Sequence, residues 1–363
     1  MVATRGRRRW RRGPALLAAV VVGVLLVAGA GCSGRRPQPA PSSSGAAPSS
    51  PTVSPSPSPQ PGADLTGPLN VLLVGVDTRV SVPGWEPHAD AVLLMHIDQA
   101  LDRAYLFSLP RDLVVDIPAF PKAKFRGQRT KLTHAMTYGS RPDGRKNAPD
   151  TAQGFELLAE TVSDYTGIER FDAGAVITFT GFDRLVDALG GVDITVDQRV
   201  VSLHRQPDGR HRAPSGSGYV GPRMVYEKGP RHMVGWQALD YARQRYITGG
   251  DYSRQRHQQQ LIKAIVAALL DQGVPRDPAR LDAVLAALGD TVTFVGHGRR
   301  VVDFAFALSR LTPSAMTLVA LPGDSVGQGG SYRGEQLTET GRRFLTELRA
   351  GRADAYLAEH PKL

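Results

Sequence analysis

The chain has a single cysteine, Cys32, among its 363 residues. One thiol can build neither a disulfide framework within the chain nor a cysteine-ligated metal site, so both are excluded. The sequence also lacks the patterns GxxxxGK(S/T) and HExxH. These absences argue against a P-loop nucleotide enzyme and against a metalloprotease of the HExxH type.

Acidic residues are missing from the first 36 positions, which hold eight arginines. The formal net charge of the whole chain is +10, and without these eight arginines it falls to +2. The basic character therefore belongs to the N-terminus, and the rest of the chain is nearly neutral. This distribution argues against a nucleic-acid partner, which would need a basic surface on the folded part.

The N-terminus has the layout of an export signal. A basic segment (residues 5–13) precedes 17 apolar residues (14–30) and the sequence GCSG. Basic flanks stay in the cytoplasm, so everything after the apolar run is predicted to be extracytoplasmic. Two readings of residues 1–32 stay open: a lipoprotein signal that leaves Cys32 lipidated, or an uncleaved signal anchor. Both predict a tether to the cell membrane.

Residues 33–66 are predicted to be a disordered linker. Between Pro37 and Pro61, 17 of 25 residues are proline or serine. Such a segment cannot bury a core and favours extended polyproline-II conformations, so it would act as a spacer. The folded domain is predicted to occupy residues 67–363.

Three apolar runs, residues 69–77, 91–97 and 104–110, predict strands that are buried on both faces. Because their connections are short, an antiparallel meander is the simplest arrangement. Asp77, Asp90 and Arg111 then meet at one rim of the sheet. Two carboxylates and a guanidinium at one rim suit a divalent metal that bridges to an anionic ligand. The alternative is that the carboxylates cap strand ends and Arg111 pairs with Asp112.

The remaining pattern alternates helices and strands, which predicts one α/β/α domain with a mixed central sheet flanked by helices. The expected helices are 151–165 and 181–191, and the expected strands are 173–179, 192–197 and 317–322. Residues 131–139 are polar and mixed. Residues 201–232 predict a long surface loop, in which His204, His211 and His232 are expected to be surface residues.

Arginines gather between residues 240 and 260, in DYARQRYITGGDYSRQRHQQQ. The run YARQRY (241–246) predicts a strand, with Arg243 and Arg245 on the same side. Asp251 or Ser253 is expected to cap the next helix, which places Arg254 on its first turn beside free backbone N–H groups. Three guanidinium groups arranged in this way suit a multiply charged anion such as a phosphate. The alternative is a solvated basic face.

These motifs, taken in order, resemble the LytR-CpsA-Psr family of bacterial cell-wall enzymes over roughly residues 67–345. The resemblance is carried by LNVLLVGVDTR, HADAVLLMHID, LFSLPRDLVVDIP, KLTHAMTYG, LVDALGGVDITV and GWQALDYARQRYITGGDYSRQRHQQQ. It implies an exported, membrane-tethered phosphotransferase that moves a glycopolymer from a polyprenyl-pyrophosphate carrier to peptidoglycan, typically to the C6 hydroxyl of muramic acid. It also implies that Mg²⁺ and arginines hold the pyrophosphate and that an apolar pocket takes the lipid.

Carried over by motif, the family's functional residues fall on nine positions. The metal-associated carboxylates are Asp77 and Asp90. The pyrophosphate-binding side chains are Arg111, Lys131, Arg243, Arg245, Arg254 and Gln258, and Asp251 joins Arg111, Arg243 and Arg245 as a catalytic residue. Two positions depart from the family pattern, because His88 and His257 stand where arginine is usual. Arg256 beside His257 is a candidate substitute.

The predicted function is a Mg²⁺-dependent glycopolymer phosphotransferase, in which Asp251 or Asp90 takes the proton of the acceptor hydroxyl. One rival is a pyrophosphatase that passes the same intermediate to water. Another is a non-catalytic wall protein that binds anionic polymers through its arginines. The polymer stays open among arabinogalactan, teichoic acid and capsule, and its choice is expected to depend on residues 201–232.

Overall fold

The computed structural model describes residues 60–77, 85–146 and 148–363. The predicted export signal and most of the predicted linker lie outside these residues. Within the described part of the chain, no helix combines the length and the hydropathy that crossing a bilayer requires.

A six-stranded mixed sheet forms the middle layer of the described chain, in the order β13-β6-β1-β2-β3-β14. The strands are β1 (Leu69–Val76), β2 (Ala89–Ile97), β3 (Ala104–Leu109), β6 (Ala173–Thr178), β13 (Val292–Val295) and β14 (Met316–Val319). The strands β1, β2 and β3 form the antiparallel meander that the sequence predicted. The sheet is mixed because β6 runs parallel to β1 and β14 runs parallel to β3.

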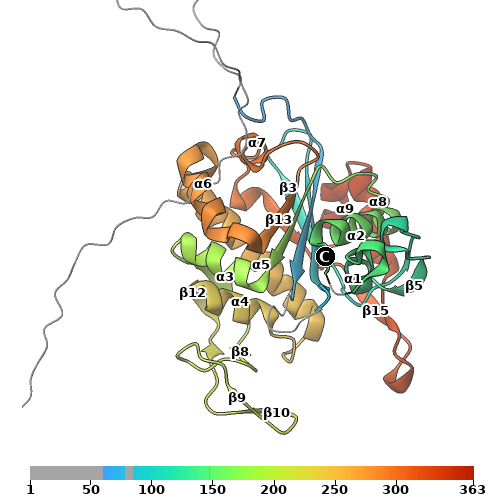
Figure 1. Ribbon diagram of the computed structural model, residues 1–363. Helices are drawn as coiled ribbons and strands as arrows, with labels where there is room; N and C mark the ends of the chain where they lie inside the picture. The colour runs from blue at the N-terminus through green and yellow to red at the C-terminus, as the bar shows by residue number, and fades with distance from the viewer. Residues whose placement is uncertain (1–59, 78–84, 147) are drawn as a thin grey trace, which may run out of the picture. The chain divides into compact units, whose positions relative to one another are not determined.

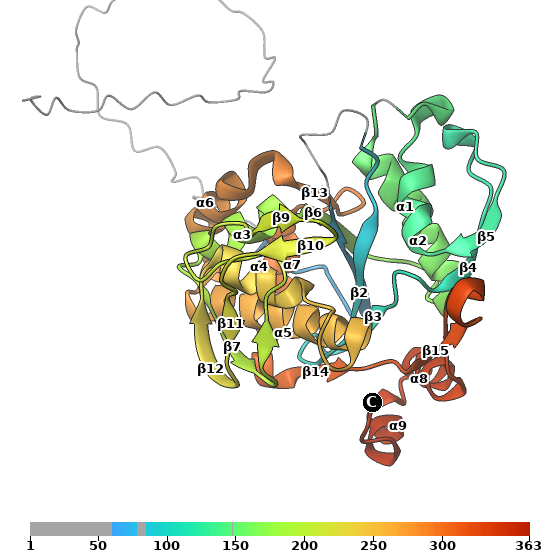
Figure 2. The same cartoon turned by 90° about the horizontal axis from the view of Figure 1, so that it is seen from below.

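Helices cover both faces of this sheet (Figures 1 and 2). One face packs on α1 (Thr133–Gly139), α2 (Thr151–Thr166), α8 (Glu339–Arg349) and α9 (Ala353–Glu359). The other side holds α3 (Phe179–Ala188), α4 (Gly235–Arg243), α5 (Gly250–Asp271), α6 (Pro278–Leu288) and α7 (Val301–Ala307). Residues of β1 to β3 alternate between these layers, so that Leu72, Val74 and Leu94 face α2 while Val71, Leu93 and Met95 face α5 and α7. The predicted α/β/α architecture is confirmed for the described residues.

Local signals in the sequence explain where several of these helices begin and end. The Asp150 carboxylate accepts a hydrogen bond from the Gln153 N–H at 2.9 Å and caps α2, which ends at Gly167 with φ of 69°. The Thr178 hydroxyl caps α3, so this helix begins before the predicted residue 181. Gly174 lets α2 approach the sheet, since a Cβ there would meet the Phe155 ring at 2.0 Å.

Several short sheets lie outside the central one. The predicted strand 192–197 forms as β7 (Val192–Val196), but it pairs with β12 (Gly229–Met233) and not with the central sheet, so the expectation of one sheet was wrong here. Residues 201–232 are more structured than the predicted loop. They include β9 (Ala213–Ser215), β10 (Gly218–Val220) and β11 (Val225–Tyr226), and the last of these pairs with β8 (Val200–Val201). Two further hairpins are β4 (Val114–Ile117) with β5 (Gln128–Lys131), and β15 (Gly323–Val326) with β16 (Gly334–Leu337).

The predicted strand at 241–246 was wrong, because α4 continues to Arg243. Tyr241 is fully buried and stacks on His257 of α5 with ring centroids 4.2 Å apart. This packing holds Tyr241 and its neighbours in a helix despite their alternating pattern. The capping prediction for α5 was also wrong, since Gly249 with φ of 86° is the N-cap and Asp251 lies in the first turn.

Candidate functional site

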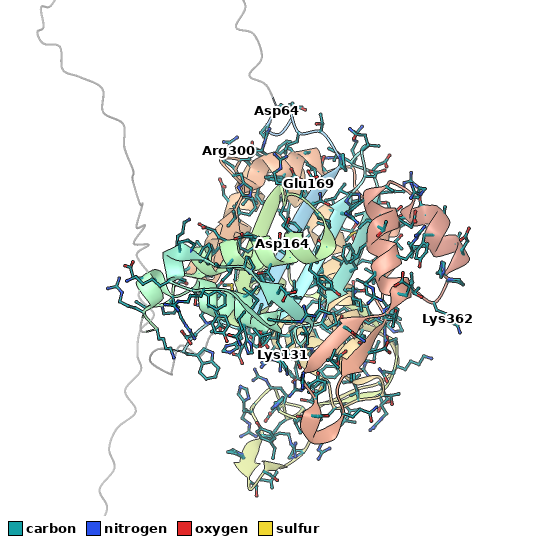
Figure 3. The ribbon with its side chains drawn as sticks, turned by 90° about the vertical axis from the view of Figure 1, so that its right-hand side faces the viewer. Asp64, Lys131, Asp164, Glu169, Arg300 and Lys362 are labelled. Atoms are coloured by element: carbon teal, nitrogen blue, oxygen red, sulfur yellow. The ribbon has the colours of Figure 1, made fainter. Side chains whose placement is uncertain are left out.

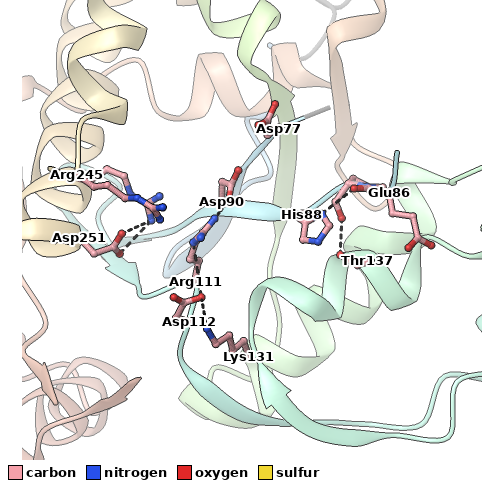
Figure 4. A network of polar contacts seen from close by, with 12 residues as sticks. Asp77, Glu86, His88, Asp90, Arg111, Asp112, Lys131, Thr137, Arg245 and Asp251 are labelled. Atoms are coloured by element: carbon pink, nitrogen blue, oxygen red, sulfur yellow. Dashed lines mark hydrogen bonds and ion pairs between the residues drawn. The ribbon is translucent and has the colours of Figure 1, made fainter. Parts of the chain in front are cut away.

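The rim predicted from the meander exists in the structure. Asp77 follows β1, Asp90 opens β2, and Arg111 follows β3 at the same end of the sheet (Figure 4). The Arg111 guanidinium donates a hydrogen bond to the Asp90 carboxylate and forms an ion pair with it. Its Nε lies 3.9 Å from Asp112, a weaker contact than the one to Asp90. Burial lowers the pKa of Arg111, but the charge and hydrogen bond of Asp90 outweigh burial and raise it.

Arg243 reaches the same rim from the end of α4. Its guanidinium lies 3.9 Å above the centroid of the Phe179 ring, a cation–π contact that fixes its position. Burial lowers the pKa of Arg243, while the charges of Asp77 and Asp90 oppose this shift. Arginine keeps its proton in any such setting, so the site holds a fixed cation here.

Arg254 lies in the first turn of α5, as the sequence predicted. Its side chain is 8% exposed, and its Nη2 lies 2.9 Å from the Asp251 carboxylate. Its Nε is buried and makes no hydrogen bond to any described residue. Burial lowers the pKa of Arg254, the Asp251 charge opposes this, and the positive charges of Arg111 and Arg245 add to the lowering. A buried donor without an acceptor, among other cations, is the arrangement that an anionic ligand would complete.

These side chains line one open cavity of about 540 Å³, which we call the basic cavity. Seven of the nine predicted site residues are in its wall: Asp77, Asp90, Arg111, Arg243, Arg245, Arg254 and Gln258. Four arginines and two aspartates give this wall a formal charge of +2. Electrostatics and hydrogen bonding of this kind favour a multiply charged anion with several oxygen acceptors.

The other two predicted residues lie beside the basic cavity and not in its wall. The Lys131 ammonium is 3.4 Å from Asp112 and 4.9 Å from the centroid of the Tyr332 ring. Asp251 lines a neighbouring cavity together with Asp112 and Tyr332. Asp251 still contacts the arginines through its ion pair with Arg254, whereas Lys131 contacts Asp112 and Tyr332 instead.

The two positions that depart from the family pattern have different surroundings. His88 lines the basic cavity, and its Nδ1 lies 2.9 Å from the Glu86 carbonyl oxygen. His257 is fully buried, and its Nε2 lies 3.1 Å from the Asp197 carboxylate. Arg256 also turns to Asp197, with Nε 2.5 Å from Oδ2, so it does not substitute for a cavity arginine.

Sequence reasoning missed His204, which was expected at the surface. This side chain is half-buried, lines the basic cavity, and packs edge-on against Tyr219 with ring centroids 5.1 Å apart. Burial lowers the pKa of His204, and the nearby positive charge of Arg243 lowers it further. Its neighbours come from the segment 201–232, where no local pattern indicates which residues face inward.

A smaller apolar pocket lies next to the basic cavity and shares Phe179, Arg243 and Gln258 with it. Residues of β1, β2, α3, α4 and α5 complete its wall, among them Leu93, Leu239 and Ile262. Its volume is about 30 Å³, enough for a group the size of a water molecule. A lipid chain would enter only if these helices moved apart.

The rim of the sheet has only a few side chains that could bind a magnesium ion. Within the described residues, no group of three or more histidine, cysteine, aspartate or glutamate side chains could hold a metal. Asp77 and Asp90 nevertheless present two carboxylates to the basic cavity. Magnesium is usually bound by one or two carboxylates, with substrate phosphates and waters supplying the remaining ligands. The residues present fit a Mg²⁺ ion that arrives with a phosphate ligand.

One further short motif matches a catalytic pattern but lacks the local structure that this pattern requires. Residues 323–327 read GDSVG, a match to GxSxG, in which a nucleophilic serine would sit on a tight turn from a strand into a helix. Here Ser325 lies within β15, paired with Glu335 of β16 in a hairpin. The match therefore does not define a hydrolase site.

The fold and the cavity define a three-layer α/β/α protein with an arginine-lined cavity at one rim of its central sheet. The model of the LytR_cpsA_psr family matches residues 41–340, and the chain belongs to that family. The cell wall biosynthesis protein LcpA of Corynebacterium glutamicum is 25% identical over 288 residues, which are 73% of this chain and 52% of that protein. The polyisoprenyl-teichoic acid–peptidoglycan teichoic acid transferase TagU of Enterococcus faecalis is 27% identical over 246 residues, 67% of this chain and 68% of TagU.

Solved structures show the same fold. The crystal structure of Bacillus subtilis TagU aligns with a TM-score of 0.53 at 20% identity and covers 78% of this chain and 96% of TagU. A structure of TagT bound to LI-WTA aligns with a TM-score of 0.55 at 22% identity, over 78% of this chain and 89% of TagT. Among the curated relatives, the matches to LcpA and to the TagU of Bacillus cereus each span about half of the relative's length, 52%.

Proposed function

We propose that the protein is a Mg²⁺-dependent phosphotransferase that moves a glycopolymer from a polyprenyl-pyrophosphate carrier to a sugar hydroxyl of peptidoglycan. The observation that carries this proposal is the basic cavity, where four arginines surround two aspartates at the rim of the sheet. We further propose that the protein is exported and tethered to the membrane by residues 1–32, as a lipoprotein or through a signal anchor.

The arginines of the basic cavity would bind the pyrophosphate. Arg254 is the most buried of them, with 8% of its side chain exposed, so its hydrogen bonds to phosphate oxygens would form away from bulk water and be stronger for it. The Arg254 Nε has no acceptor among the described residues and would gain one. Because each guanidinium is planar and held in place, little reorganisation is needed when negative charge shifts during the reaction.

Asp77 and Asp90 would hold the Mg²⁺ ion, which supplies Lewis-acid stabilisation of the phosphate oxygens when it is bound. Asp90 already accepts a hydrogen bond from Arg111. This contact positions both the carboxylate and the guanidinium on the same side of the cavity. The ion pair also keeps the two aspartates from repelling one another in the absence of ligand.

In the proposed reaction, the acceptor hydroxyl oxygen forms a bond to the phosphorus on the sugar side of the pyrophosphate. The bond from that phosphorus to the bridging oxygen breaks, and polyprenyl monophosphate leaves with the electron pair. The hydroxyl proton passes to a carboxylate, for which Asp251 and Asp90 are the two candidates. Both lie next to a guanidinium of the site, Asp90 beside Arg111 and Asp251 beside Arg254.

The experiment uses the full-length protein in detergent with a polyprenyl-pyrophosphoryl saccharide, peptidoglycan fragments and Mg²⁺. Mass spectrometry would detect a phosphodiester adduct between the saccharide and the glycan strand. We expect an adduct with the wild type and with the control Arg310→Ala, whose side chain is exposed and lies outside the cavity wall. Lipid cleavage that yields free sugar phosphate would instead indicate a pyrophosphatase, and binding without cleavage a wall-binding module.

A further inference from the structure

A second cavity borders the basic cavity and has the opposite charge. It has a volume of about 250 Å³, and we call it the acidic cavity. Its wall consists of Pro110, Asp112, Arg245, Tyr246, Asp251, Tyr332 and Glu335. Three carboxylates and one guanidinium give its wall a formal charge of −2, which the adjacent Lys131 ammonium at 3.4 Å from Asp112 reduces to −1, against +2 for the basic cavity. Arg245 and Tyr246 belong to both walls, so they form the ridge between the two cavities.

The outer wall of the acidic cavity is the hairpin of β15 and β16, which projects from the domain (Figure 1). Contacts with two other elements hold this hairpin in place. The Tyr252 hydroxyl of α5 donates to the Glu335 carboxylate at 2.5 Å, and the Glu335 N–H donates to the Asp112 carbonyl oxygen at 2.8 Å. Lys131, labelled in Figure 3 beside the hairpin, covers the Tyr332 ring. The acidic cavity is therefore a built feature with walls from four parts of the chain.

The side chains of the acidic cavity fit an uncharged, hydroxyl-rich ligand. Carboxylates accept hydrogen bonds from hydroxyl groups, whereas they repel a pyrophosphate or an anionic polymer. Two tyrosines are more exposed than large aromatic residues usually are: the exposed fraction is 72% for Tyr246 and 39% for Tyr332. Such rings present an apolar face with a polar edge, which suits the alternating apolar and hydroxyl faces of a sugar.

We propose that the acidic cavity is the subsite for the acceptor glycan, and that the charge difference across Arg245 sorts the two substrates. This assignment rests on the proposed function and extends it, because it gives each of the two substrates its own cavity. The donor pyrophosphate belongs in the basic cavity, and the neutral glycan strand belongs beside Tyr332. The acceptor hydroxyl would then meet the phosphorus at the ridge, next to Arg245 and Asp251.

The first experiment measures acceptor binding without any donor. A soluble N-acetylglucosamine oligosaccharide, which is uncharged and shares the sugar backbone of the glycan strand, is the probe, and saturation-transfer NMR on the full-length protein in detergent is the readout. We expect saturation of the sugar ring protons with the wild type, with Tyr332→Phe and with Arg243→Ala. We expect at least a fivefold weaker signal with Tyr332→Ala, since the stacking ring is lost. The matched control Tyr219→Ala removes an exposed ring from the basic cavity and leaves the signal unchanged.

The second experiment measures transfer kinetics with the same variants. Because the stacking ring is lost, Tyr332→Ala is expected to raise the acceptor KM at least fivefold, in line with the NMR signal, with the donor KM unchanged. If the wild type transfers the saccharide but Tyr332→Ala changes neither the acceptor KM nor the NMR signal, the subsite assignment is refuted while the proposed function stands. If the glycan binds and depends on Tyr332 but no adduct ever forms, the proposed function fails and the subsite stands.

Discussion

Arg254 and Arg256 lie two positions apart on α5, and the structure predicts opposite consequences when each is replaced by methionine. Methionine keeps a flexible chain and removes the charge. Arg254 lines the basic cavity with an unsatisfied buried Nε. A hydrogen bond to a charged group contributes about 1.5–3 kcal/mol, so Arg254→Met is expected to lower kcat/KM for the donor by roughly 10- to 150-fold.

The stability of Arg254→Met is expected to be unchanged or higher. The guanidinium is almost fully removed from water, and its ion-pair partner Asp251 is only partly buried. Removing one partner of an ion pair is costly when the charge left behind is buried, but here the buried charge is the one removed, and its desolvation cost disappears with it. Asp251 keeps access to solvent and needs no new partner. A buried Arg254 is therefore expected to lower the folding stability of the protein, as is usual for a residue whose role is to bind a ligand.

Arg256→Met is the matched control. Its guanidinium lies 2.5 Å from Asp197 and its side chain is 40% exposed, outside the basic cavity. An ion pair this exposed is worth about 0.2–1 kcal/mol, which corresponds to a fall in Tm of roughly 1–4 °C in a domain of this size. Donor turnover should stay within about twofold of the wild type, since a residue outside the cavity makes no contact with the transferred group.

Thermal unfolding by circular dichroism and donor cleavage followed by mass spectrometry test this pair together. The reasoning would be refuted if Arg254→Met kept more than a third of the wild-type kcat/KM. It would also be refuted if Arg254→Met unfolded well below Arg256→Met, because the buried arginine would then be a structural residue and not a ligand-binding one.

Three further predictions follow from the same geometry. Arg243→Ala should lose at least tenfold in donor turnover with an unchanged circular dichroism spectrum, measured against Arg310→Ala, because it removes a cation held on the Phe179 ring. EDTA should abolish adduct formation and Mg²⁺ should restore it, while turnover that survives chelation would exclude the role given to Asp77 and Asp90. Burial raises the pKa of Asp183 to about 6, so the folded state binds this proton more tightly than the unfolded chain. Asp183→Asn should therefore be more stable than the wild type by about 1–2 kcal/mol at pH 7.5, and urea unfolding should show this difference vanishing as the pH falls below about 4.

The rim of the site could be predicted from sequence because it depends on local connections. An antiparallel meander is the simplest arrangement of three consecutive strands, and a meander fixes which strand ends share an edge. Asp77, Asp90 and Arg111 follow from this without any knowledge of the rest of the fold. Arg254 was predicted correctly for a similar reason, since the apolar period of α5 sets which residues fall in its first turn.

The other parts of the site depend on contacts that sequence patterns do not record. YARQRY alternates like a strand, but Tyr241 packs under His257 and keeps the segment helical. His204 lines the basic cavity through the fold of the segment after β8, where its ring packs against Tyr219 from β10. The acidic cavity joins the end of β3 to a hairpin more than 200 residues further on. No periodicity or spacing predicts that Tyr332 and Asp112 line one wall.

The ion pairs of the site give a physical reason for its readiness to bind an anion. Four arginines close together would repel each other, and this repulsion would cost stability if nothing balanced it. Asp90 balances Arg111, and Asp251 balances Arg254. Both aspartates are partly exposed, so Asp90 could turn to the Mg²⁺ ion and Asp251 to water when a phosphate takes their place beside the arginines. A doubly charged ligand would therefore replace the two aspartates as the partner of Arg111 and Arg254, and the cavity need not rearrange to receive it. The same exchange frees Asp251 on the side that faces the acidic cavity, where the acceptor hydroxyl is expected to lose its proton.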